Sequence, residues 1–103
     1  MATLTLGEIQ HEVGSWGDET FPHSTPDSVL AHLKREVQEL LDADPVNRQA
    51  ECADVVMLLM HIAHKEGWSL ERAVLMKLAI NQSRSWGEPD EQGVVEHIRE
   101  EAR

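Results

Sequence analysis

The chain of 103 residues suits a single domain, residues 1–103, which alone would bury only about two thirds of its unfolded surface. Its formal net charge of −10, from 19 acidic against 9 basic residues, argues against nucleic acid or an anionic membrane as the main partner. The sequence shows no signal peptide, and its longest apolar run, residues 55–60, is far shorter than the ~20 residues that span a bilayer. We therefore expect a soluble, cytoplasmic protein whose core a partner subunit would help to complete.

The spacing of apolar residues predicts an all-α, single-domain subunit with about four main helices packed antiparallel. Aromatic residues are few, with three Trp, one Phe and no Tyr, and Val, Ile and Thr are too scattered to indicate strands. Residues that cap or break helices set the predicted boundaries, namely Thr5, Gly14, Gly17, Thr25, Pro26, Asp44, Pro45 and Gly67. The predicted helices cover residues 5–16, residues 25 to a turn at 41–45, residues 45–66 and residues 70–84, with a loop at 17–24 and a short acidic helix at 93–102.

The third predicted helix is apolar over nearly its whole circumference, so both of its sides have to be buried. One helical layer from this small chain can cover one side, and we expect a second copy to cover the other. The single Cys52 lies in this apolar run and cannot form an internal disulfide, so we expect a small buried hydrophobic residue. His61 and His64 lack the spacing of a zinc site, and we assign them no ligand role.

Two acidic pairs flank the predicted turn, with Glu36 and Glu39 before it and Glu51 and Asp54 after it. Residues three apart share one helix face, and antiparallel packing would turn the two pairs toward each other. Glu36 and Glu39 border the apolar arc of their helix, whereas a solvated charge run would lie opposite that arc. Carboxylates gathered beside apolar surface repel strongly, and protonation or bound cations relieve the repulsion. Of these two, we expect cations.

A second polar set lies on the fourth predicted helix, where Lys77, Asn81 and Arg84 share one stripe. A point charge and a planar donor fork suit phosphate oxygens, although ion pairs with the acids of a neighbouring helix would also explain the stripe. At the end of the first helix, Trp16 and Phe21 are either core or loop anchors or a surface that stacks on a ligand ring.

Oxygen-only ligands favour hard cations, and Mg²⁺ typically completes its shell with substrate phosphates. A triphosphate carries roughly four negative charges and the carboxylates add as many, so two divalent ions fit the charge balance. Two such ions can polarise a phosphoryl oxygen, hold the attacking water and stabilise the leaving group. The residues alone therefore predict metal-dependent phosphoryl hydrolysis, without choosing the bond or the base.

The three motifs together, Glu36-x-x-Glu39, Glu51-x-x-Asp54 and Lys77-x-x-x-Asn81-x-x-Arg84, resemble those of the MazG-like, all-α nucleoside triphosphate pyrophosphohydrolases. The similarity covers roughly residues 25–100 and is greatest with the short dATP/dGTP pyrophosphohydrolases of phages and prophages. It implies hydrolysis of a (deoxy)nucleoside triphosphate, with the purines dGTP and dATP favoured, between the α and β phosphates to give the monophosphate and pyrophosphate. It also implies a homodimer formed through the central helices, or a homotetramer of two dimers, in a bacterial or phage-infected cell.

The resemblance further implies a metal centre. Mg²⁺, or Mn²⁺ in its place, would be held as two ions per site by Glu36, Glu39, Glu51 and Asp54. A water activated by the metals would be the nucleophile, and Glu36 or Glu39 would accept its proton as the catalytic base.

The same resemblance implies the substrate contacts. Lys77 and Arg84 would bind phosphate oxygens, and Asn81 would assist at the phosphate or the sugar. Gln10 and Trp16 of the first helix would contribute to the nucleoside pocket.

Two functions of other kinds compete with this one. A non-catalytic nucleotide-binding or protein-interaction module with the same fold would bind its ligand without turnover. A di-iron carboxylate bundle fits less well because such sites use Glu-x-x-His pairs, and here Glu39 and Asp54 occupy the positions of the histidines.

Overall fold

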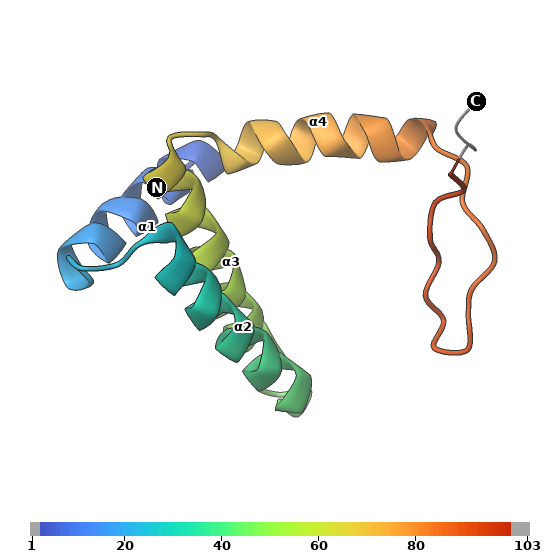
Figure 1. Cartoon of the computed structure of the whole chain (residues 1–103), viewed down its shortest axis with the longest axis horizontal. Coiled ribbons are helices and arrows are strands. Elements are labelled where there is room, and N and C mark those ends of the chain that lie inside the picture. The colour runs from blue at the N-terminus through green and yellow to red at the C-terminus, as the bar shows by residue number, and fades with distance from the viewer. Residues whose placement is uncertain (1–2, 100–103) are drawn as a thin grey trace. The chain divides into compact units, whose positions relative to one another are not determined.

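The computed structural model describes residues 3–99, which form four α-helices and no β-strand (Figure 1). The helices are α1 (Leu6–Thr20), α2 (Pro26–Asp42), α3 (Arg48–Glu66) and α4 (Leu70–Ser83). This confirms the predicted all-α class. The chain divides into two compact units, residues 1–71 and residues 72–103. Within the described chain, every helix is too short or too polar to cross a membrane.

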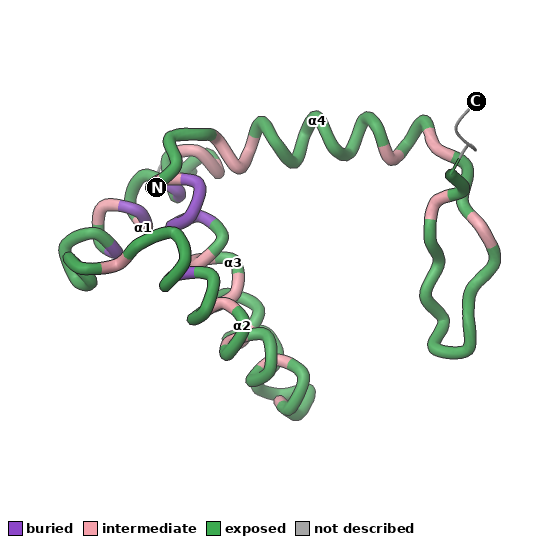
Figure 2. The backbone as a smooth tube through the Cα atoms, in the orientation of Figure 1, coloured by how far each residue is buried: buried purple, intermediate pink, exposed green. Residues whose placement is uncertain are grey.

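The first unit is built around α3, which packs against both α1 and α2. Its buried apolar residues are Val29 of α2 and Met60, Ile62 and Ala63 of α3. Figure 2 shows the buried positions gathered where α1, the start of α2 and the later half of α3 meet. The core of this unit is therefore small and lies at one end of α3.

The helix α1 is longer than the sequence predicted, because it continues to Thr20 instead of ending near residue 16. The expected capping box of Thr5 and Glu8 is present, with reciprocal hydrogen bonds of 3.1 Å each. Gly14 and Gly17, which were predicted to break the helix, lie inside it and are buried. A Cβ at Gly14 would collide with the His64 side chain, and one at Gly17 would lie 2.8 Å from the ring of His61. The two glycines therefore allow α1 to approach α3 closely.

The boundaries of α2 and the end of α3 agree with the sequence prediction. Thr25 and Ser28 form a capping box around Pro26, and Gly67 ends α3 in the left-handed conformation with φ of 78°. The start of α3 was placed wrongly at Pro45, since the helix begins at Arg48. Asp44 instead stabilises a separate turn, in which its carboxylate accepts the backbone N–H of Asn47 at 3.1 Å.

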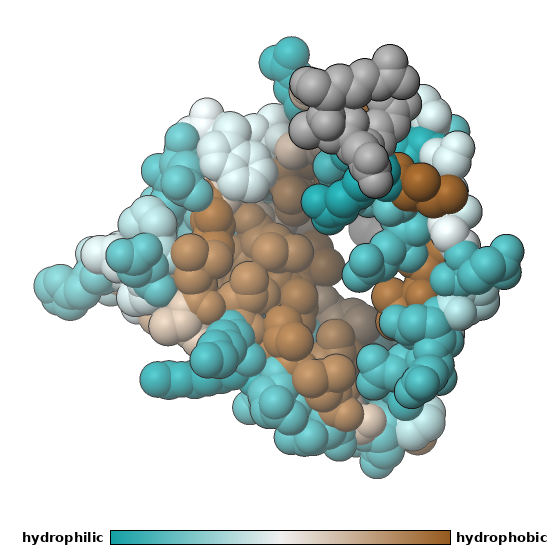
Figure 3. Space-filling view, turned by 45° about the vertical axis from the view of Figure 1, so that its right-hand side comes forward, coloured by the Kyte–Doolittle hydropathy of each residue, from teal (hydrophilic) through white to brown (hydrophobic). Residues whose placement is uncertain are grey.

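The prediction that Cys52 is buried is wrong for the single chain, where this residue is exposed. All four buried residues of α3 lie in its later half, whereas Val56 of its earlier half is 41% exposed. The earlier half of α3 is thus incompletely covered by the chain itself. Figure 3 shows hydrophobic side chains gathered into a broad area on the face in view.

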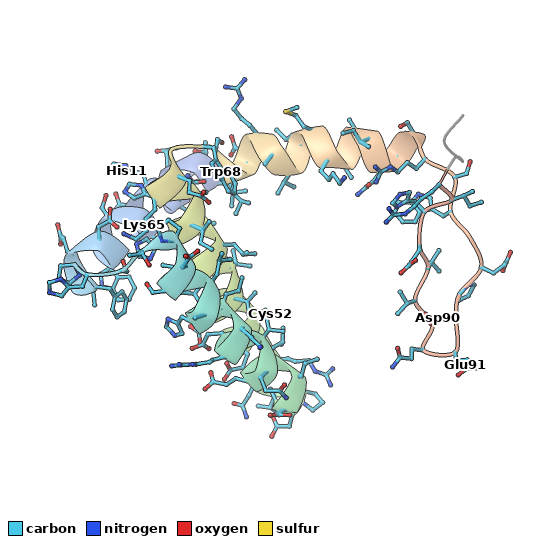
Figure 4. The ribbon with its side chains drawn as sticks, viewed as in Figure 1. His11, Cys52, Lys65, Trp68, Asp90 and Glu91 are labelled. Carbon is cyan, nitrogen blue, oxygen red and sulfur yellow. The ribbon has the colours of Figure 1, made fainter. Side chains whose placement is uncertain are left out.

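In the second unit, the predicted helix over residues 93–102 is wrong for its described part, residues 93–99, while residues 100–102 lie outside the described chain. This segment instead runs antiparallel to residues 85–87, with Gly87 N–H donating to the Glu96 carbonyl at 2.9 Å and Ile98 N–H to that of Ser85 at 2.8 Å. Gly93 makes the reversal possible through its φ of 78°. Asp90, near the turn in Figure 4, accepts the N–H of Val94 at 2.9 Å and stabilises it.

Candidate functional site

Three carboxylates from α2 and α3 converge at one point of the first unit. One oxygen each from Glu36, Glu51 and Asp54 lies within 4.8 Å of the others. Glu36 comes from the second half of α2, and Glu51 and Asp54 come from the start of α3, which packs against α2. The turn between the two helices therefore brings residues of both acidic pairs together, as antiparallel packing predicts.

Two oxygens of this acidic cluster lack a partner. Oε2 of Glu36 and Oε2 of Glu51 are buried and accept no hydrogen bond within the described chain. The other oxygen of Glu36, Oε1, lies 3.1 Å from Nε2 of His32, one helical turn earlier. Buried polar atoms without partners are rare in native proteins because they lose their hydration without compensation. These two oxygens therefore favour a ligand from outside the chain.

Glu39 lies beside the cluster but outside the group of three oxygens, and its side chain is exposed. The pKa of Glu36 is raised, chiefly by the closeness of the Glu39 carboxyl, then by burial and by the negative charge of Glu39. Contact with His32 opposes this rise, and the charge of Asp54 adds to it. A cation bound here would favour the ionised carboxylates.

A hollow of about 140 Å³ adjoins the acidic cluster. Trp16 of α1 and Phe21 of the following loop give the hollow an aromatic side, and Glu36 and Asp54 give it an acidic side. The remaining lining residues are His32, Met57 and Leu58. The rings of Trp16 and Phe21 meet edge to face, with centroids 5.7 Å apart, and are 51% and 42% exposed. Accessible aromatic surface thus lies next to oxygen ligands, an arrangement that suits a ring joined to a phosphate.

Sequence reasoning missed a second polar cluster in the same unit. Asp18 of α1 lies 2.9 Å from Nε2 of His61, 3.3 Å from Nε2 of His64 and 3.0 Å from Nζ of Lys65, all on α3. Figure 4 shows Lys65 where α1 and α3 meet. The predicted loop at residues 17–24 hid Asp18, whose alignment with α3 exists only because α1 continues to Thr20. The cluster fixes the end of α1 that carries Trp16.

The predicted nucleoside contact Gln10 has a structural role in this unit. It is buried, its Nε2 donates to the carbonyl of Trp68 at 2.8 Å, and its Oε1 accepts the N–H of Leu70 at 2.8 Å. These bonds hold the connection between α3 and α4. A contact between Gln10 and a nucleoside stays a prediction.

The predicted phosphate stripe belongs to the second unit. Lys77 and Asn81 lie on α4 and Arg84 directly follows it, and Nη1 of Arg84 donates to Oδ1 of Asn81 at 3.1 Å. Asn81 and Arg84 are half-buried, whereas Lys77 is exposed. The guanidinium of Arg84 is therefore held in place, with other N–H donors left for a ligand.

Sequence comparison identifies the family of the chain. Residues 9–103 match the family described as dATP/dGTP pyrophosphohydrolase. The chain belongs to this family. A dATP/dGTP diphosphohydrolase of Cyanophage S-2L is 35% identical over 94 residues, which are 91% of this chain and 89% of the relative. A protein of the same name from Salmonella phage PMBT28 is 36% identical over 97 residues. The matched residues are 94% of this chain but only 33% of the Salmonella phage protein.

A solved structure is similar to this family member along almost the whole chain. It is the Cyanophage S-2L MazG-like pyrophosphohydrolase bound to dGDP and three catalytic Mn²⁺ ions per active site. The two structures agree with a TM-score of 0.81 at 33% identity, over 95% of this chain and 97% of the other. The resemblance to MazG-like pyrophosphohydrolases, inferred from the motifs, is thereby confirmed.

Proposed function

We propose that this chain hydrolyses dGTP and dATP between the α and β phosphates, releasing the monophosphate and pyrophosphate with the help of divalent cations. The observation that carries the proposal is the convergence of Glu36, Glu51 and Asp54, with two buried oxygens that lack partners. Family membership and the dGDP and Mn²⁺ of the cyanophage structure support the same activity.

The donor set fits a hard divalent cation. All three converging ligands are carboxylates, and a cation would occupy the unpartnered oxygens of Glu36 and Glu51 while screening their repulsion. We propose Mg²⁺ as the ion, with Mn²⁺ able to replace it, and at least two ions per site. The bound ions would supply charge stabilisation for the phosphoryl group and acidify the attacking water.

The residues around the ions would divide the remaining work. Glu36, Glu51 and Asp54 would hold the metals, and Glu39, which acts on Glu36, would join them or orient water. Glu36 or Glu39 would accept the proton of the attacking water, since Glu39 lies beside the cluster and raises the pKa of Glu36.

The proposed nucleotide contacts use two kinds of chemistry. Trp16, in the hollow beside the cluster, would stack on the purine, and Gln10 of the same helix would contribute to the nucleoside pocket. Lys77, Asn81 and Arg84 would bind the phosphate chain, because an Arg held by Asn81 presents its remaining donors in a fixed fork.

We also propose that residues 1–103 act as one catalytic domain completed by a homodimer or a homotetramer. Exposed apolar residues on α3 and α4 support this, among them Val56, Leu59, Leu75, Met76 and Leu78. So many exposed large apolar residues are more typical of an interface than of a free surface. Light scattering coupled to size exclusion would give the number of copies.

A panel of ribo- and deoxynucleoside triphosphates, each assayed with Mg²⁺ and with Mn²⁺, tests the activity. Purine deoxynucleotides should release pyrophosphate, and a chelator should stop the reaction. Release of orthophosphate would contradict the assigned bond. Nucleotide binding without any turnover would instead show the non-catalytic module.

A further inference from the structure

A polar hollow of about 520 Å³ lies within the second unit and shares no lining residue with the acidic cluster. Among the residues that the structure describes, its lining contains two arginines, one histidine and two serines and no acidic residue; these lining residues are Ser83, Arg84, Ser85, His97, Ile98 and Arg99. In a chain with a net charge of −10, a concave surface whose described ionisable groups are all basic is notable. Such a surface favours an anion.

The hollow is built by the backbone, which pairs residues 85–87, shortly after the end of α4, with residues 96–98. Trp86 and His97 form an antiparallel bridge, and the Ile98 N–H donates to the Ser85 carbonyl at 2.8 Å. The Trp86 ring meets the His97 ring edge to face, with centroids 6.0 Å apart, and its Nε1 donates to the Asn81 carbonyl at 3.1 Å. These contacts place His97 and Arg99 beside Arg84.

The basic groups that line the hollow repel one another electrostatically. The pKa of His97 is lowered, first by loss of solvation and then by the positive charges of Arg84, Arg99 and Lys77, while Glu96 opposes this effect. Positive groups that repel one another gain when an anion with several oxygens neutralises them together. A multiply charged anion therefore fits the hollow better than a single carboxylate.

We propose that Arg84, His97 and Arg99 form a pyrophosphate-binding site, in which Arg99 and His97 extend the phosphate contacts beyond the stripe on α4. The identity of the ligand rests on the proposed hydrolysis, which makes pyrophosphate, whereas the hollow itself rests on the geometry of the second unit. Two guanidinium forks and one imidazole offer donors to several phosphate oxygens at once. The hydroxyl of Ser85 adds a neutral donor at the same wall, whereas that of Ser83 already donates to the Ile80 carbonyl at 2.7 Å.

Inorganic pyrophosphate, titrated calorimetrically into the full chain, tests this site. The buffer contains a chelator, so that binding through metal ions at the acidic cluster does not contribute. Arg99→Gln should weaken binding about tenfold or more, and His97→Gln should weaken it less. Arg99→Lys, which keeps the charge but loses the fork, should fall between wild type and Arg99→Gln.

Arg35→Gln is the matched control, because it removes the same charge from an exposed position of α2. The proposal is overturned if wild type binds no pyrophosphate, if Arg99→Gln binds it as wild type does, or if Arg35→Gln weakens binding as much as Arg99→Gln. Hydrolysis of dGTP is assayed separately on the same proteins. Arg99-dependent binding of pyrophosphate by a chain that hydrolyses no nucleotide would refute the proposed function and keep the site. Hydrolysis of dGTP by a wild-type chain that binds no pyrophosphate would refute the site and keep the proposed function.

Discussion

Glu36 of α2 and Glu51 of α3 each bury one carboxylate oxygen, Oε2, that has no hydrogen-bond partner in the part of the chain that the structure describes. One oxygen of each side chain also lies within 4.8 Å of one from Asp54. An arrangement of this kind costs stability unless a cation joins the oxygens. The two helices therefore hold their acids in a geometry that metal binding would make favourable.

The first prediction concerns Asp54→Asn. The variant should lose turnover, and its affinity for Mn²⁺ should fall at least about tenfold, because one charged ligand becomes a neutral amide. Its melting temperature in chelator should equal or exceed that of wild type, since repulsion among the carboxylates is relieved. Calorimetric titration with Mn²⁺ and thermal melts in chelator measure the two effects.

Asp42→Asn is the control for this variant, because Asp42 is an exposed residue at the end of α2 and its amide can still accept from Gln38. It should keep wild-type Mn²⁺ affinity and turnover. A sharp loss of melting temperature in Asp54→Asn without metal would contradict the account, since it would show that the carboxylate stabilises the fold by itself.

The second prediction concerns the glycines that face α3. Gly14→Ala should lower the free energy of unfolding by roughly 1–3 kcal/mol, because the added Cβ would overlap the His64 side chain and force α1 away from α3. At Gly7 on the same helix, an added Cβ would meet Thr5 Oγ1 at 3.9 Å and no other described atom within 4 Å, so Gly7→Ala should raise the same quantity by up to about 1 kcal/mol. Urea unfolding followed by circular dichroism measures both; equal effects would show that Gly14 is not a close-packing position.

These glycines also show where sequence reasoning stopped. Local signals placed the cap at Thr25 and the end of α3 at Gly67, because each depends on neighbouring residues alone. A glycine that breaks a helix and one that admits a neighbouring helix have the same one-letter code, and only the position of His61 and His64 separates the two cases. Because the sequence does not distinguish these two roles of a glycine, it did not predict the length of α1.

The acidic cluster could be predicted from the sequence, whereas the Asp18 cluster could not. The spacing of Glu36, Glu51 and Asp54 around one turn lets helix geometry bring them together. Asp18 contacts its partners on α3 only through tertiary packing, and no spacing pattern near Asp18 predicts those contacts. Exposure of Cys52 likewise depends on how much of α3 the other helices cover, which periodicity does not report.

The third prediction concerns the pH dependence that Asp18 gives to stability. Its pKa is lowered from 3.8 to about 2, first by the hydrogen bond to His61, then by that to Lys65 and by the charges of Lys65 and His64. A carboxyl with a lowered pKa in the folded state stabilises the fold above its unfolded pKa and loses this effect as pH falls toward the folded value. Asp18→Asn should therefore melt a few degrees, about 4 °C, below wild type at pH 5 to 7.

The melting difference should shrink as pH falls from about 4 toward 2, because wild-type Asp18 then becomes protonated. Glu19→Gln removes a charge from the next, exposed position of α1 and should show no such difference. Since the Asp18 side chain is 44% exposed, solvent screening keeps the effect modest. A gap between wild type and Asp18→Asn that stays constant down to pH 2.5 would refute the role of the carboxylate charge.

The fourth prediction decides between the two explanations of Trp16. If its ring stacks on the purine, Trp16→Ala should raise the KM for dGTP about tenfold while the melting temperature without nucleotide changes little, because the side chain is already 51% exposed. Trp16→Phe keeps an aromatic face in the hollow next to Glu36 and should restore most of the affinity. Steady-state kinetics and thermal melts of the two variants separate the cases. A large fall in melting temperature with unchanged KM would show that Trp16 anchors α1 and its following loop, since losing a packing contact lowers stability without touching the nucleotide.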